Sequence, residues 1–294
     1  MTRRDAVLLL VLGAIWGAVF PLGSVVLEEL APPVVMVART GLSALLLVPV
    51  ALRDGAFVRE WRRHPGSLLT ASVLQMTLPI VLLTIGQQHV AAGLAGVLLG
   101  TQPVWATVLA AAVERRVRPG AAVGVVVGLA GVVLLFWKDL GGASAPVSGA
   151  LLVAAAACYA AGAIYIQRVL TDVHPITVAA SALSVSCLLL LPTLAPVPAR
   201  FPSPATALWL TVLGTVATGG SLALFYVLIG RVGAVRANLP AYLAPAFALL
   251  YDIPLGHFPT ATALGGLALI LTGSAVAAHS PRHQGEEPLP RATL

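Results

Sequence analysis

Long apolar runs follow one another along almost the whole chain, with only short polar connections between them. A helix needs about 20 apolar residues to cross the hydrocarbon core of a bilayer. Proline, glycine and charged residues divide the chain into ten such segments, near residues 6–27, 34–52, 66–86, 91–113, 119–137, 148–167, 176–195, 206–229, 237–255 and 261–278. The sequence therefore predicts an all-α integral membrane protein with ten transmembrane helices.

The composition excludes an ordinary soluble domain. Of the 294 residues, 59% are hydrophobic and 10% are charged, whereas soluble globular domains have about 45–50% and about 25%. A net charge of +6 would suit a nucleic-acid-binding protein if the chain were soluble. Because the basic residues lie between the apolar runs, we expect them to set the membrane topology, and we expect no nucleic-acid partner.

The basic residues also predict which side of the membrane each connection faces, since cytoplasmic loops carry an excess of Lys and Arg. With a cytoplasmic N-terminus, that side holds Arg3, Arg4, Arg53, Arg59, Arg62, Arg63, Arg115, Arg116, Arg118, Arg168, Arg231, Arg236, Arg282 and Arg291. The opposite side then holds only Lys138 and Arg200, and Arg39 lies inside a span. We therefore expect a multi-pass protein of the cell inner membrane with both termini in the cytoplasm.

Prolines, glycines and other residues at characteristic places in the first half of the chain recur in the second half at an offset of 142 residues. Matching positions are Pro33 and Pro175, Val90 and Val232, Pro103 and Pro245, Gly124 and Gly266, and Gly131 and Gly273. Five spans in each copy would insert the second copy upside down, as in many secondary transporters. We expect the first repeat in residues 1–140, the second, inverted repeat in 147–278, and a disordered cytoplasmic tail in 279–294.

Residues at characteristic places in these segments carry a resemblance to a known family. They are Trp16-Gly17, Pro33, Arg39, Gln102-Pro103, Glu114-Arg115, Gly124, Gly131, Tyr159-Ala160, Pro175, Tyr242, Pro245, Gly266 and Gly273. In this order and spacing, residues 6–278 resemble the EamA-type transporters of the drug/metabolite transporter superfamily. The resemblance implies two five-helix repeats around a central cavity, lined by the first, third, fourth, sixth, eighth and ninth helices, and it favours export from a bacterial cytoplasm.

Two charged residues lie within the predicted spans, where a charge is costly and therefore suggests a function. Arg39 is six residues past Pro33, about 9 Å along its helix at about 1.5 Å per residue. Its long side chain could reach the interface or the acidic pair Glu28 and Glu29, and we favour this anchoring over contact with a substrate carboxylate. For Asp252, near the outer end of its span, a solvated polar end is favoured over a proton relay. Both residues are candidates for coupling or gating.

Uncharged polar and aromatic side chains at middle depths are candidates for a substrate path. The candidate substrate-binding residues are Trp16, Gln75, Gln102, Trp105, Tyr159, Tyr226, Asn238 and Tyr242. The alternative role for such groups is to hold neighbouring helices together by hydrogen bonds, which is favoured for any single Ser or Thr.

Small residues along two of the predicted spans indicate close helix packing. Gly124, Gly128 and Gly131 give one span a flat face, as do Gly265, Gly266 and Gly273 in another. Such faces suit contacts within the molecule or in a homodimer. The six histidines offer no pair at helical spacing and no neighbouring cysteine, so no metal and no cofactor are expected.

The leading hypothesis is a secondary transporter, and an exporter, for a small neutral or zwitterionic metabolite that works by alternating access. Hydrophobic or aromatic amino acids are the first substrates to test, since aromatic rings can stack on a solute or hold an ammonium group. The expected partners are this small-molecule substrate and the lipid bilayer. Two alternatives stay open, an integral-membrane enzyme that acts on a lipid and a membrane scaffold that transports nothing. An enzyme would need paired acids or metal ligands at membrane depth.

Overall fold

The computed structural model describes residues 3–53, 55–114, 119–136, 145–197, 201–232, 240–256 and 258–278, and every regular element in these ranges is a helix. The α-helices are α1 (Arg3–Leu27), α2 (Pro32–Leu52), α3 (Ala56–Arg63), α4 (Pro65–Ser72), α5 (Leu78–Gly86), α6 (Ala92–Leu99), α7 (Gln102–Glu114), α8 (Pro119–Phe136), α9 (Ala145–Val169), α10 (Pro175–Leu190), α11 (Pro204–Gly214), α12 (Ser221–Val232), α14 (Pro240–Asp252) and α15 (Ala261–Ala278). Two π-helical segments, η1 (Val73–Thr77) and η4 (Thr215–Gly220), and three 3₁₀ segments, η2 (Gln87–His89), η3 (Leu191–Leu194) and η5 (Ile253–Leu255), complete the described elements. The prediction of an all-α protein is confirmed for these residues.

Proline marks the start of several helices, as the sequence punctuation indicated. Pro32, Pro65, Pro175 and Pro204 each occupy one of the first two positions of a helix, where the missing N–H costs nothing. Before α11, the side chain of Ser203 also accepts a hydrogen bond from a backbone N–H of the first turn. Local sequence therefore favours these helix starts.

Seven helical stretches are long and apolar enough to cross a membrane. They are Arg3–Glu29, Pro32–Leu52, Pro65–His89, Ala92–Leu109, Pro146–Val169, Pro175–Leu194 and Pro204–Phe225. Three shorter apolar helices, Ala122–Gly131, Leu243–Asp252 and Ala261–Gly273, fall in the remaining predicted segments. The protein is therefore a multi-pass membrane protein, and the count of ten spans stays a prediction.

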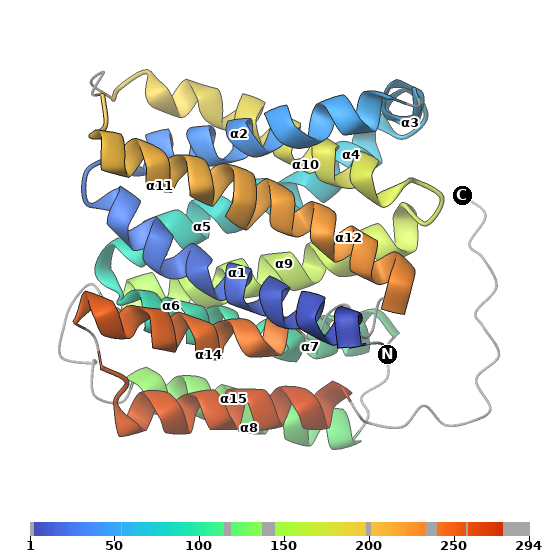
Figure 1. Ribbon diagram of the computed structural model, residues 1–294. Helices are drawn as coiled ribbons and strands as arrows, with labels where there is room; N and C mark the ends of the chain where they lie inside the picture. The colour runs from blue at the N-terminus through green and yellow to red at the C-terminus, as the bar shows by residue number, and fades with distance from the viewer. Residues whose placement is uncertain are drawn as a thin grey trace.

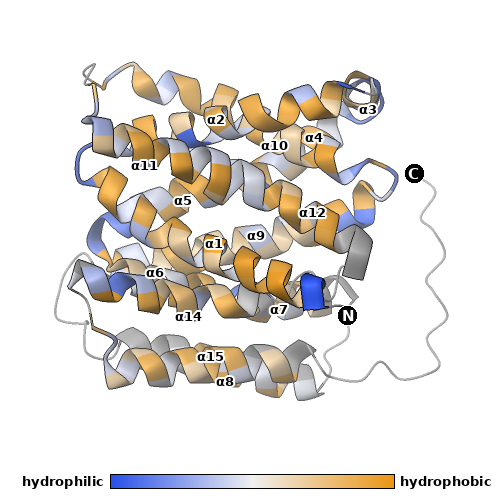
Figure 2. Cartoon of the chain, viewed as in Figure 1, coloured by the Kyte–Doolittle hydropathy of each residue, from blue (hydrophilic) through white to orange (hydrophobic). Residues whose placement is uncertain are grey.

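The helices lie side by side and share a common direction, from α2 and α10 on one side of the bundle to α8 and α15 on the other (Figure 1). Their middles are apolar, and hydrophilic residues gather at the two ends of the bundle (Figure 2). This distribution suits a bundle whose long axis crosses the bilayer, because charged groups are costly in the hydrocarbon core.

The internal repeat is visible in the elements themselves. α8 covers 119–136 and α15 covers 261–278, so both ends of the two helices are offset by 142 residues. The two π-helical segments, which begin at Val73 and Thr215, keep the same offset. The repeat is therefore structural as well as compositional.

The largest buried cluster joins both halves of the chain. Its members include Phe20 of α1, Leu98 of α6, Leu152 of α9, Ala248 of α14 and Ile270 of α15. The most extensive helix contacts also cross between halves, pairing α8 with α15, α1 with α14 and α2 with α10. The two repeats therefore form one bundle rather than two separate domains.

The predicted glycine faces meet each other inside the molecule. A Cβ placed on Gly273 would overlap the backbone of Gly128 and lie 2.5 Å from the carbonyl oxygen of Gly124. A Cβ on Gly131 would lie 2.8 Å from the carbonyl oxygen of Gly266. These faces therefore serve the α8–α15 contact, and they give no support to the homodimer, which stays a prediction.

Candidate functional site

Two of the long apolar stretches change their helical winding near the middle. In both, π-helical residues replace α-helix, namely Val73–Thr77 between α4 and α5 and Thr215–Gly220 between α11 and α12. A π-helical turn holds one extra residue and leaves backbone groups in altered positions, and such turns are frequent at functional sites. Side-chain hydroxyls form hydrogen bonds with some of these backbone groups. Oγ1 of Thr218, for example, donates to the carbonyl oxygen of Leu213 at 2.8 Å.

Arg39 lies inside the bundle and contacts the second π-helical segment. The residue is 7% exposed, and its Nε donates a 2.8 Å hydrogen bond to Oγ1 of Thr218. The carboxylate of Glu29 accepts hydrogen bonds from the backbone N–H and the hydroxyl of Ser203, at 2.6 and 2.8 Å. The expectation that Arg39 anchors at the interface or on the acidic loop is therefore wrong. Its partner comes from a helix that is remote in sequence, which a reading of its own helix could not reveal.

Close contact between α2 and α11 brings Arg39 to this position. The hydroxyl of Ser43 lies 2.7 Å from the carbonyl oxygen of Gly214 and 2.8 Å from that of Arg39. A Cβ on Gly214 would lie 2.8 Å from the Cβ of Leu42, so only glycine permits this approach. The backbone of α2 is thus held against α11 beside Arg39.

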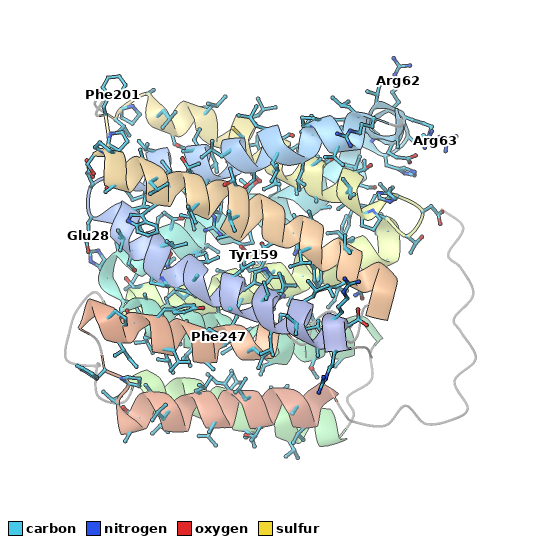
Figure 3. All side chains as sticks on the ribbon, viewed as in Figure 1. Glu28, Arg62, Arg63, Tyr159, Phe201 and Phe247 are labelled. Atoms are coloured by element: carbon cyan, nitrogen blue, oxygen red, sulfur yellow. The ribbon has the colours of Figure 1, made fainter. Side chains whose placement is uncertain are left out.

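Two further polar residues lie near α9: Tyr159 belongs to α9 itself, and Gln75 belongs to η1 of the first repeat. The phenol of Tyr159 is close enough to Arg39 for the two groups to interact electrostatically, and it lies centrally among the helices (Figure 3). Gly162, three residues on and therefore on the same face of α9, packs against Gln75, whose Oε1 would lie 2.5 Å from a Cβ at that position. This Oε1 is buried and has no hydrogen-bond donor among the described residues.

Arg39, Thr218, Tyr159 and Gln75 together form what we call the polar centre. They come from α2, η4, α9 and η1, so both π-helical segments contribute to it. Arg39, Tyr159 and Gln75 were candidates in the sequence. Thr218 was missed, because one threonine in an apolar run carries no signal of its own until the π-helical winding and the contact with α2 are known.

Asp252 serves a different purpose from the one expected. The residue is 3% exposed, and its Oδ2 accepts a 2.8 Å hydrogen bond from the backbone N–H of Gly93 in the first turn of α6. A carboxylate at a helix N-terminus satisfies an N–H group that has no partner in the helix and complements the helix dipole. The solvated polar end expected for Asp252 is therefore wrong, since the α14 carboxylate caps α6 from within the bundle. Among the described residues, no group of three or more His, Cys, Asp and Glu could hold a metal ion.

The predicted fourth span, 91–113, is broken. α6 ends at Leu99 and α7 begins at Gln102, which is partly buried at the start of α7. At the break, a Cβ on Gly100 would lie 2.8 Å from Cγ of Pro245 in α14. Gln102 therefore sits where two helices cross closely, and such interrupted helices often form binding sites in transporters.

The other candidates lie apart from the polar centre or outside the described side chains. Trp16 packs in an apolar cluster with α12, with its ring centroid 5.4 Å from that of Phe225. Trp105 has a buried indole N–H with no acceptor among the described residues, and its helix α7 packs chiefly on α8, α9 and α15. Asn238 and the side chains of Tyr226 and Tyr242 lie outside the described part of the structure, so their predicted roles stay predictions.

The apolar helices define a multi-pass membrane protein, and polar groups buried within such a bundle are typical of the transporter class. The EamA-like transporter family matches residues 4–137 and again residues 147–278. The chain belongs to this family, and the resemblance read from the sequence is confirmed.

Two known proteins are similar to the chain over nearly its whole length. The Uncharacterized transporter YvbV of Bacillus subtilis (strain 168) is 27% identical over 282 residues, which are 92% of this chain and 90% of that protein. A protein crystal structure with 18% sequence identity covers 94% of this chain and 98% of its own, with a TM-score of 0.67. The first supports a transporter, and the second supports the fold alone.

Proposed function

We propose that this protein is a secondary transporter that exports a small neutral or zwitterionic metabolite by alternating access. Hydrophobic and aromatic amino acids are the first class to test. The observation that carries the proposal is the polar centre among otherwise apolar helices. Arg39 binds Thr218 and interacts electrostatically with Tyr159, and Gln75 packs against Gly162, one turn along α9 from Tyr159. A polar solute needs such groups to replace its hydration on the way through a bilayer.

The proposed architecture has ten transmembrane helices in two inverted repeats, within residues 1–140 and 147–278. Matching contacts between the repeats support it. α2 packs on η4 of the other repeat, and α10, which holds the place of α2 in the second copy, packs on η1. Such an exchange of equivalent partners is expected when two copies are related by a two-fold axis, and an odd number of spans in each copy would put that axis in the membrane plane.

We further propose that both termini face the cytoplasm and that the membrane is the cell inner membrane. The tail predicted for residues 279–294 lies outside the described part of the structure. Arg62 and Arg63 lie at the same end of the bundle as the N-terminus, and Glu28 and Phe201 lie at the other end (Figure 3). The positive-inside rule then favours the arginine-bearing end as the cytoplasmic one.

Alternating access requires the two repeats to exchange conformations about the polar centre. The two π-helical segments and the α6–α7 break are places where a helix can bend, since each interrupts the regular backbone ladder. We place the substrate path between the repeats, with Trp16, Gln102, Trp105, Tyr226, Asn238 and Tyr242 as further candidate lining residues.

Counterflow in proteoliposomes tests the proposed function. Vesicles loaded with a mixed pool of unlabelled hydrophobic and aromatic amino acids are diluted into labelled ones without a proton gradient. We expect saturable transient accumulation of one class, which protein-free vesicles lack. If protein shown to be folded by its melting transition gives no counterflow, with or without an imposed pH gradient, amino acids are not the substrate.

A further inference from the structure

Arg39 is a buried positive charge, and no acidic side chain of the described residues lies beside it. The residue is 7% exposed, and the ion pair recorded in the described residues joins Arg59 and Glu60 instead. A guanidinium stays charged in proteins, and a charge at membrane depth is costly unless something pairs with it. Glu29 and Asp252 are engaged elsewhere, with Ser203 and the Gly93 amide.

The single hydrogen bond of Arg39 leaves the outer part of its guanidinium available. Nε donates to Oγ1 of Thr218, whose own proton goes to the carbonyl oxygen of Leu213. This chain of hydrogen bonds fixes the plane of the guanidinium through Nε. Nη1 and Nη2 make no hydrogen bond to any residue in the described ranges. A fork of this kind matches the two oxygens of a carboxylate.

A purely structural arginine would use its terminal nitrogens to join helices. In this bundle other groups already join α2 to α11, namely the Ser43 hydroxyl and the close approach of Leu42 to Gly214. The guanidinium is therefore held in place by one neutral hydroxyl, and its two terminal nitrogens find no acceptor in the described part of the chain.

The side chains on and beside α9 indicate which other groups the ligand would carry. Tyr159 interacts electrostatically with the guanidinium and carries an aromatic ring. Gln75 packs against Gly162, one turn along α9 from Tyr159. The Gln75 Oε1 is a buried acceptor to which no described residue donates. A zwitterion with an apolar side chain supplies an anion for Arg39, a donor for Gln75 and a group to pack on the ring.

We propose that Nη1 and Nη2 of Arg39 bind the carboxylate of the transported solute, so that the substrate class is a carboxylate-bearing zwitterion such as an α-amino acid. This inference rests on the proposed function and deepens it. Thr218 is the positioning residue that orients the guanidinium through Nε. A neutral solute, which the sequence alone left open, would leave the buried charge unpaired.

Ligand-induced thermal stabilisation of the purified protein tests this site without transport. The probes are phenylalanine, 3-phenylpropionate, which lacks the ammonium group, and phenylalaninamide, which lacks the carboxylate. We expect the wild-type protein to be stabilised by the first two probes and not by the amide. Arg39→Gln should weaken the response to phenylalanine roughly tenfold to 100-fold in concentration, as for the loss of a hydrogen bond to a charged group, and should abolish the preference for acid over amide.

Three further variants separate binding from folding. Arg39→Lys keeps the charge but loses the fork, so it should respond between wild type and Arg39→Gln. Thr218→Val keeps the charge and removes the acceptor for Nε of Arg39. It should weaken the thermal response to both acids and leave the response to the amide unchanged. Arg62→Gln removes an exposed arginine from α3 and should behave as wild type. If Arg39→Gln does not fold, the lysine and valine variants carry the test.

The binding and counterflow results together separate a failure of the proposed Arg39 site from a failure of the proposed transport function. A wild-type protein that responds equally to acid and amide, or to none of the probes, overturns the assignment of Arg39, as does a folded Arg39→Gln protein that keeps the acid preference. Counterflow can still succeed in those cases. Conversely, Arg39-dependent binding of the acids without any counterflow would keep the site and overturn the proposed transport function.

Discussion

At the scale of single residues, the two repeats place different chemistry at equivalent positions. Arg39 corresponds to Ser181 at the 142-residue offset. Ser181 is fully buried and accepts a 2.8 Å hydrogen bond from the indole N–H of Trp61 on α3, whereas Arg39 reaches Thr218. The repeat therefore supplies a symmetric scaffold, and one copy supplies the charge of the polar centre.

Asp252 also acts as a single residue, through the hydrogen bond by which its carboxylate caps α6. Asp252→Ala should destabilise the protein by about 1–2 kcal/mol, since the N-terminus of α6 would lose its acceptor for the Gly93 N–H. Asp252→Asn keeps an oxygen in the same place and should retain most of that stability. The measurement is the melting temperature of each variant in detergent.

Counterflow with and without a pH gradient provides the second readout for Asp252. If the carboxylate only caps α6, folded Asp252→Asn should keep the wild-type response to the gradient. A gradient response present in wild type and lost in this variant would instead assign proton coupling to Asp252.

At the scale of helices, contact distance decides which glycines matter. Gly273 lies against the backbone of Gly128 in the α8–α15 contact, and no atom of another residue would touch a Cβ on Gly66 of α4. Neither position has a left-handed backbone, so space and not conformation separates them. Close backbone approach is how helices associate in a bilayer, where apolar burial gives no net attraction.

Gly273→Ala should lower the stability of the protein by about 1–3 kcal/mol, the usual cost of forcing extra atoms into a packed contact. The matched control, Gly66→Ala, should be neutral or stabilising by up to about 1 kcal/mol, because alanine favours helix. Melting temperatures in detergent compare the two. Equal melting temperatures for both variants would show that α8 and α15 separate more easily than their contact suggests.

At the scale of the whole molecule, an inverted repeat makes a prediction about sidedness. Glu29 and Thr171 are equivalent at the 142-residue offset, in the α1–α2 and α9–α10 connections. If the repeats are parallel, equivalent connections face the same side of the membrane. If they are inverted, the two connections face opposite sides.

Single cysteines introduced without the two native cysteines test this with a membrane-impermeant maleimide. Glu28→Cys, next to Glu29, should be labelled in intact cells, and Thr171→Cys should be labelled only after the membrane is permeabilised. Phe201→Cys serves as the external reference and Arg62→Cys as the internal one, since both residues are exposed. Labelling of Glu28→Cys and Thr171→Cys from the same side would contradict the inverted arrangement.

The sequence by itself determined the class of protein, the family, the positions of the apolar helices and the repeat. These depend on local properties, since a run of apolar residues cannot stay in water and a proline or glycine limits the backbone wherever it occurs. The helix starts at Pro32, Pro175 and Pro204 follow from such local rules. The polar centre was predicted in part, because Arg39, Tyr159 and Gln75 stand out as polar groups in apolar spans.

Only the tertiary structure decided what these groups do. Arg39 meets Thr218 at a separation of 179 residues, and Asp252 meets Gly93 at a separation of 159. Hydropathy gives the depth of a residue in its own helix, but it does not say which face of that helix meets which neighbour. For that reason the sequence favoured an anchoring arginine and a solvated aspartate. In the packed helices the arginine is a buried charge that no acidic side chain of the described residues neutralises, and the aspartate is a helix cap.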